Sequence, residues 1–116
     1  MSNGVDKIPE LLHAIELVND AIALTEKALV DNPSIDEERE LNIKLARLKA
    51  RLAVLDAELD AALAGDSSVQ APTQAQLAQM ESLSANVEQA ANQSVAGRIA
   101  VIAKVLDLAS AVIGIS

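Results

Sequence analysis

The strongest constraint on the fold is a run of leucines in the middle of the chain, spaced alternately by four and three residues. Side chains at this spacing share one face of an α-helix, because the helix has 3.6 residues per turn. The run predicts a helix over about 35–64 whose apolar face must be covered by another helix. Its members are Leu41, Leu45, Leu48, Leu52, Leu55 and Leu59, and Ala62 continues the series.

A seven-residue repeat upstream of this run predicts an earlier helix over about 8–31. Pro9 suits a first helical turn, where a missing N–H costs nothing. Pro33 cannot continue the helix, and Ser34 with Glu37 forms the capping-box pattern that starts the next one. The repeated positions are Ile8, Ile15, Ile22 and Leu29, with Leu11, Val18 and Thr25 between them.

These two helices are predicted to form an antiparallel, coiled-coil-like hairpin over 8–64, because the connection between them is short. Facing residues then have a constant sum of residue numbers, and a sum of 70 pairs every seam residue with another one, such as Ile15 with Leu55. Ala14, Ala21 and Ala28 form a column of small residues that would let a neighbouring helix approach closely. The expected hairpin core is Ile15, Ile22, Leu29, Leu41, Leu48, Leu52 and Leu55.

An apolar helical half is predicted over 73–115, after a loop at 65–72. Thr73 and Gln76 form a second capping box. A last helix is expected over about 98–113, and the chain between these helices is either broken near 92–97, which Gly97 favours, or continuous. The core side of the first of these helices is expected to hold Leu77, Met80, Leu83, Val87 and Ala91. The sequence thus predicts one all-α domain, a bundle of three or four helices over 1–116.

The composition limits the partners of the chain. It has no cysteine and no aromatic residue, so the core must be aliphatic and there is no thiol chemistry. The formal net charge of −8 argues against nucleic acid, whose binding needs cations that displace phosphate counterions. It also argues against anionic lipid. The first residues lack the apolar run of a signal peptide, so a cytoplasmic protein is expected, with signal-less secretion left open.

Chemistry at a catalytic or metal site has little support in the sequence. Glu10 and His13 match the Glu-x-x-His motif of di-iron bundles, but such sites need two copies and the chain has one histidine. The heptad places His13 opposite the seam, on the solvent side. The acidic residues at 36–40 complement the dipole of a helix start. We therefore expect no enzyme, no metal, no cofactor and no small-molecule substrate.

Five cations lie on the predicted helix over 35–64, interleaved with acids. This pattern favours a solvated, salt-bridged face, and a docking surface is the alternative. The cations are Arg39, Lys44, Arg47, Lys49 and Arg51.

The last predicted helix is apolar over most of its circumference, which indicates burial from more than one side. It has more apolar surface than one hairpin needs, so we expect a non-catalytic interaction or assembly module that self-associates or binds a helical partner there. Alternatives are a secretion- or membrane-related factor that exposes this helix, and an acidic inhibitor. Lys104 and Asp107, which could pair, disfavour a membrane span. The expected interaction residues are Ile99, Ile102, Val105, Leu106, Val112 and Ile113.

Overall fold

A computed structural model describes residues 4–65 and 73–113 of the chain, which fold into four α-helices. They are α1 (Gly4–Leu29), α2 (Ile35–Leu63), α3 (Gln74–Ala90) and α4 (Val95–Val112). The described part of the chain contains no strand. The prediction of an all-α bundle is confirmed, and the bundle has four helices rather than three.

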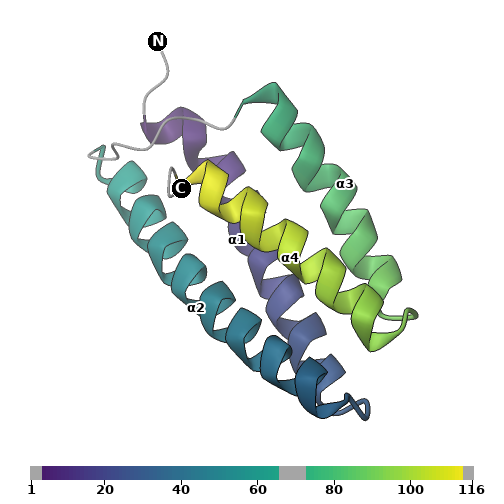
Figure 1. Ribbon diagram of the computed structural model, residues 1–116. Coiled ribbons are helices and arrows are strands. Elements are labelled where there is room, and N and C mark those ends of the chain that lie inside the picture. Colours follow the sequence, from purple (N-terminus) through teal and green to yellow (C-terminus); the bar gives the residue numbers. More distant parts are fainter. Residues whose placement is uncertain (1–3, 66–72, 114–116) are drawn as a thin grey trace.

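The two helices α1 and α4 form the centre of the bundle. Figure 1 shows α4 in front of α1, with α2 and α3 on the two outer sides. α1 and α4 each contact all three other helices, whereas α2 and α3 do not contact each other within the described residues. In cross-section the helices therefore form two triangles that share the α1–α4 edge. This arrangement leaves four outer grooves, one along each of the pairs α1–α2, α2–α4, α3–α4 and α1–α3.

Both predicted capping boxes are present. The Ser34 hydroxyl accepts a hydrogen bond from the Glu37 N–H at 3.1 Å, and the Glu37 carboxylate accepts one from the Ser34 N–H at 2.9 Å. Thr73 and Gln76 make the same reciprocal pair at 3.1 and 2.9 Å. These bonds satisfy N–H groups that a helix start otherwise leaves without partners, and so they fix where α2 and α3 begin.

The expected bounds of the first helix need two corrections. α1 begins at Gly4 rather than at residue 8, so Pro9 lies inside the helix and not in its first turn. α1 also ends at Leu29 instead of residue 31. The chain then makes a turn, in which the Asp31 N–H donates a hydrogen bond to the Ala28 carbonyl at 3.1 Å. Asn32 has a φ of 53° and Pro33 follows, so neither can continue a right-handed helix.

The connection between α3 and α4 is a break, as favoured, but Gly97 does not cause it. The helices are separated at residues 91–94, and Ser94 is the N-cap of α4, accepting the Gly97 N–H at 3.2 Å. α4 begins at Val95, three residues earlier than the expected start at 98, so Gly97 lies in its first turn. A Cβ atom at Gly97 would lie 2.7 Å from the Gln93 side-chain oxygen, so glycine leaves room for the turn.

Arg98 fastens this turn to the tip of the hairpin. Its side chain is buried, and Nε donates to the Gln93 carbonyl at 3.1 Å while Nη2 donates to the Ala91 carbonyl at 3.2 Å. Nη2 also pairs with the Asp31 carboxylate at 2.8 Å. One guanidinium thus caps the carbonyl end of α3 and ties it to the end of α1.

The hairpin core has an alternating burial pattern. Every pair predicted by the sum of 70 joins one buried side chain to one half-buried side chain, such as Leu48 with Ile22. The pairing itself stays a prediction. The buried Thr25 keeps its hydroxyl satisfied by donating to the Ala21 carbonyl at 2.7 Å. Of the expected hairpin core, Leu41, Leu48 and Leu55 are buried, and Ile15, Ile22, Leu29 and Leu52 are half-buried.

The small-residue column of α1 is buried, as predicted, because α3 and α4 pack on that side of the helix. Side chains of α1, α3 and α4, including Val18, Met80 and Val105, converge on a void of only about 10 Å³. A void of this size, lined by apolar atoms, is at the lower limit for one water molecule. The aliphatic core is therefore closely packed without aromatic rings.

The expected core side of α3 lies within the described residues, whereas the central loop lies almost entirely outside them. On α3, Met80, Leu83 and Val87 are buried and Leu77 is half-buried, as is Ala91, the C-cap that follows the helix. Apart from Gly65, which has a φ of 80°, the predicted loop at 65–72 lies outside the described residues. Residues 114 and 115 of the predicted apolar half also lie outside them.

Truncating a core leucine of α2 should be costly. Leu48 is 0% exposed, so Leu48→Ala should lower the free energy of unfolding by about 2–5 kcal/mol through lost burial and a cavity. Ile43→Ala on the exposed side of the same helix, where the side chain is 53% exposed, is the matched control and should change it by less than about 0.5 kcal/mol. Urea unfolding followed by far-ultraviolet circular dichroism measures both; equal losses would contradict the packing described.

Removing the Arg98 guanidinium should loosen the α3–α4 turn. Arg98→Met keeps the aliphatic stem but leaves two carbonyl groups without their donor, and should cost about 1–3 kcal/mol in the same unfolding measurement. Asp31→Asn should cost less than about 1 kcal/mol, because the Asp31 side chain is 56% exposed. A larger loss from Asp31→Asn would mean that the ion pair, rather than the carbonyl bonds, holds the turn.

Candidate functional site

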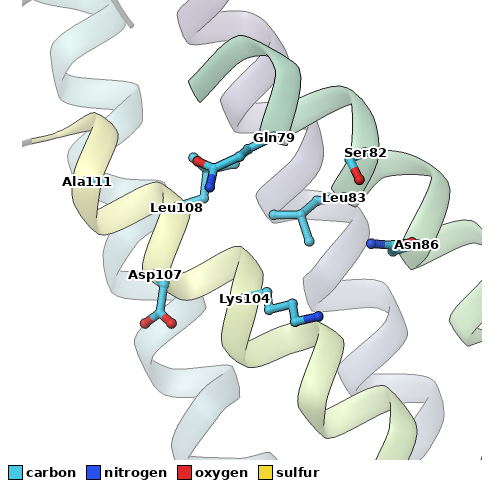
Figure 2. A pocket seen from close by; sticks show the side chains of 8 residues that line it. All are labelled: Gln79, Ser82, Leu83, Asn86, Lys104, Asp107, Leu108 and Ala111. Atoms are coloured by element: carbon cyan, nitrogen blue, oxygen red, sulfur yellow. The ribbon is translucent and has the colours of Figure 1, made fainter. Parts of the chain in front are cut away.

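The groove between α3 and α4 is lined mainly by polar side chains (Figure 2). It has a volume of about 500 Å³ and is open to solvent. In Figure 2 the Lys104 side chain reaches from α4 toward α3, whereas the Asp107 carboxylate points to the other side of α4. The residues that line this groove are Gln79, Ser82, Leu83, Asn86, Lys104, Asp107, Leu108 and Ala111. Amide, hydroxyl and ammonium groups can hydrogen-bond a ligand here, but they do not form a nucleophile–base pair.

The groove between α2 and α4 gathers three cations in a chain of negative net charge. We call it the basic groove; its volume is about 320 Å³. The cations are Lys44, Arg47 and Arg51 of α2, and they face Ala103, Leu106, Asp107 and Ser110 of α4. Three positive side chains outnumber Asp107, which lines the groove, together with Glu40, which pairs with Lys44, so the local charge still opposes that of the whole chain.

The hydrogen bonds of the basic groove hold two of its cations in place. Arg51 Nε donates to the Ser110 hydroxyl at 2.9 Å, which anchors the guanidinium against α4. Lys44 pairs with Glu40 one turn away on α2 at 3.2 Å, and its side chain is only 12% exposed. Arg47 is exposed. A positioned Arg and an exposed Arg on one side of a groove suit the binding of carboxylates, since a guanidinium can donate two parallel hydrogen bonds.

The groove between α1 and α3 carries the opposite charge. We call it the acidic groove; its volume is about 530 Å³, and its acids are Glu16, Asp20 and Glu88. Burial raises the pKa of Asp20, and the charges of Glu16 and Glu88 raise it further. Partial burial is the larger cause of this shift, and the two neighbouring negative charges add to it. A cation beside these carboxylates would favour their charged forms.

His13 also lines the acidic groove, together with Ser84 and Val87. The sequence predicts that His13 is exposed to solvent, but in the structure it is half-buried, because α3 packs across that side of α1. No group of three or more potential metal ligands occurs within the described residues. Glu10 is half-buried near His13 in sequence, and the acidic residues at 36–40 lie at the start of α2, as the helix-dipole interpretation requires.

The structure places the expected interaction residues of α4 inside the bundle. Five of the six side chains are buried and Ile99 is half-buried; the buried ones are Ile102, Val105, Leu106, Val112 and Ile113. The apolar surplus of this helix is covered because α1, α2 and α3 all contact it. A partner could reach these side chains only after the helices had separated, apart from Leu106, which lines the basic groove. No helix in the described part of the chain combines the length and hydropathy of a membrane span.

The cations of α2 are divided by their faces. Lys44, Arg47 and Arg51 line the basic groove, whereas Arg39 and Lys49 are exposed and do not. A spacing of three and four residues marks the first set as one helix face, and the same spacing joins His13, Glu16 and Asp20 of α1. This signal is present in the sequence. The sequence does not indicate that α4 would lie beside the cations and α3 beside the acids.

Neutralising Asp20 should stabilise the fold at neutral pH. Because folding raises the pKa of Asp20, the folded protein holds this proton more tightly than the unfolded chain, and stability falls as the pH rises above the ordinary value of 3.8. Asp20→Asn should therefore raise the free energy of unfolding at about pH 7 by about 0.2–0.5 kcal/mol, a gain that disappears near pH 3.

The control for this prediction is Asp60→Asn on the exposed side of α2, which should leave the stability unchanged at both pH values. Urea unfolding followed by circular dichroism gives the comparison. A loss of stability in Asp20→Asn at neutral pH, or an equal gain at both pH values, would show that repulsion in the acidic groove does not act on Asp20.

Comparisons of the chain with protein-family models, with curated proteins and with solved structures find no match. No residue therefore takes a role from a relative. The charged grooves, the burial of α4 and the chemistry of the lining side chains are the observations from which a function can be inferred.

Proposed function

We propose that the protein is a non-catalytic interaction module that receives an acidic segment of a protein partner in its basic groove. The observation that carries this proposal is the grouping of Lys44, Arg47 and Arg51 against α4 in a chain with a net charge of −8. Clefts lined by one sign of charge focus the electrostatic field and favour ligands of the opposite sign. In an acidic chain such a groove is a local exception, and it selects partners that the rest of the surface repels.

The burial of α4 supports a surface contact of this kind over one through the apolar stripe of the helix. Ile102 and Val105 are 0% exposed, so a partner that bound them would have to open the core first. The lining of the basic groove instead includes the aliphatic side chains of Leu106 and Ala103 beside its charged groups. Interfaces commonly combine a small apolar centre with a polar rim, and the basic groove provides both.

The chemistry of the lining supports a binding role over a catalytic one. The basic groove is lined by three cations, one carboxylate and one hydroxyl, together with two aliphatic side chains. The hydroxyl of Ser110 accepts a hydrogen bond from Arg51, a cation that cannot serve as a general base. A serine in this setting positions the guanidinium and is not activated for attack.

Binding of a fluorescently labelled oligo-glutamate peptide tests the proposal. Fluorescence anisotropy should show binding that weakens as salt is added, since exposed ion pairs are screened. The double variant Arg47→Glu/Arg51→Glu should weaken binding by about tenfold or more, because two favourable contacts become repulsive. The parent chain has no aromatic fluorescence to interfere.

The matched control is Arg39→Glu/Lys49→Glu, which makes the same change in net charge on α2 outside the groove. It should keep most of the affinity of the parent. Absence of peptide binding at low salt, or an equal loss in both double variants, would overturn the proposed role of the basic groove. Tighter binding of an equally charged oligonucleotide would overturn the assignment to a protein partner.

A further inference from the structure

The basic and acidic grooves open on opposite sides of the bundle. Because α1 and α4 form the shared central edge and α2 and α3 do not touch within the described residues, the α2–α4 groove and the α1–α3 groove lie diagonally across from each other. Figure 1 shows the same relation, with α4 in front between α2 and α3 and with α1 behind it. Each molecule therefore presents a positive side and a negative side across its width.

The two grooves carry charges of opposite sign. The first and last of the three cations on α2 lie seven residues apart, or about 10 Å along the helix, and three acids lie on α1 and α3. Glu16 and Asp20 are one helical turn apart, and Glu88 approaches them from α3. Side chains with these intervals can face one another along parallel helices, because charge pairs across an interface need only matched positions and opposite sign.

We propose that the partner is a second copy of this chain, whose acidic groove docks on the basic groove of the first; this inference rests on the proposed function of the basic groove. The surfaces in contact differ, so the association is head-to-tail. A pair formed in this way still has one free groove of each kind, one on each copy, so further copies can add and the products are open rows or closed rings.

The charge of the acidic groove favours this occupant over an unrelated acidic chain. The crowded carboxylates around Asp20 gain from a cationic neighbour at the same moment as the basic groove gains from an anionic one. A net charge of −8 on each copy opposes association at long range. At an ionic strength of about 0.15 M this repulsion is screened beyond about 8 Å, while pairs in close contact persist.

A charge-exchange experiment tests the proposal. Light scattering with refractive-index detection should show that the mass of the parent rises above 12.1 kDa with concentration at this ionic strength. Two double variants should each self-associate at least about tenfold more weakly than the parent. They are Arg47→Glu/Arg51→Glu, which makes both grooves acidic, and Glu16→Lys/Glu88→Lys, which makes both grooves basic. An equimolar mixture of the two variants should recover the association, because every groove again meets its opposite.

Matched controls separate the grooves from net charge. Arg39→Glu/Lys49→Glu and Glu26→Lys/Glu81→Lys make the same charge changes at exposed positions that do not line these grooves, and they should associate like the parent. Circular dichroism verifies the helical content of each variant. Where a double variant loses helix, the single changes Arg47→Glu and Glu16→Lys at exposed positions serve in its place.

A parent that remains at 12.1 kDa at every concentration would overturn the inference. A mixture that fails to recover association, or controls that lose as much as the groove variants, would also overturn it. The proposed function can fail independently of this inference. If the parent binds oligo-glutamate but stays monomeric, the inference of self-association is wrong and the basic groove serves a different acidic protein. If the parent binds no peptide, the proposed function of the basic groove is itself wrong.

Discussion

The packing of α4 determines most of this structure. This helix is apolar over so much of its circumference that one neighbour cannot cover it, and it is buried by contacts with α1, α2 and α3 together. A helix with three neighbours must lie at the centre, and α1, which has three neighbours as well, lies beside it. Charged residues other than Arg98, which has hydrogen-bond partners, then lie on the outer surface and in the outer grooves, since charge is costly to bury without a partner. The way α4 is covered thus determines which helix faces border the outer grooves, and the residues on those faces determine the charge of each groove.

The secondary structure was predictable because its signals are local. Leucine spacing in α2 and the capping boxes at Ser34 and Thr73 depend only on residues within a few turns of one another, and the structure contains the expected features. Helix ends were less predictable. Gly97 suggested a break that occurs three residues earlier, because Ser94 caps α4 and Arg98 satisfies the preceding carbonyl groups through long side-chain contacts.

The candidate site was predictable only in part, for a physical reason. The spacing of Lys44, Arg47 and Arg51 shows that they share a face, but a periodic pattern does not state which helix packs beside that face. The same limit applies to α4, whose apolar surface indicated a partner. The structure accounts for that surface within the chain, since Ile102 and Val105 are in the core. The apolar surface of one helix indicates how much area must be buried. It does not indicate whether helices of the same chain or of a partner bury that area.

The order of the helices along the chain has a consequence for synthesis on the ribosome. The hairpin α1–α2 is made first, yet one side of α1 is completed only by α4: Ala14 and Val18 line the same small void as Val105 and Ala109. Chains emerge from the ribosome amino end first, so this side of α1 stays exposed to solvent until α4 has left the exit tunnel. Between the emergence of α2 and that of α4, the nascent chain therefore carries an incompletely covered aliphatic surface. Burial of this part of the core is completed only when α4 packs against α1.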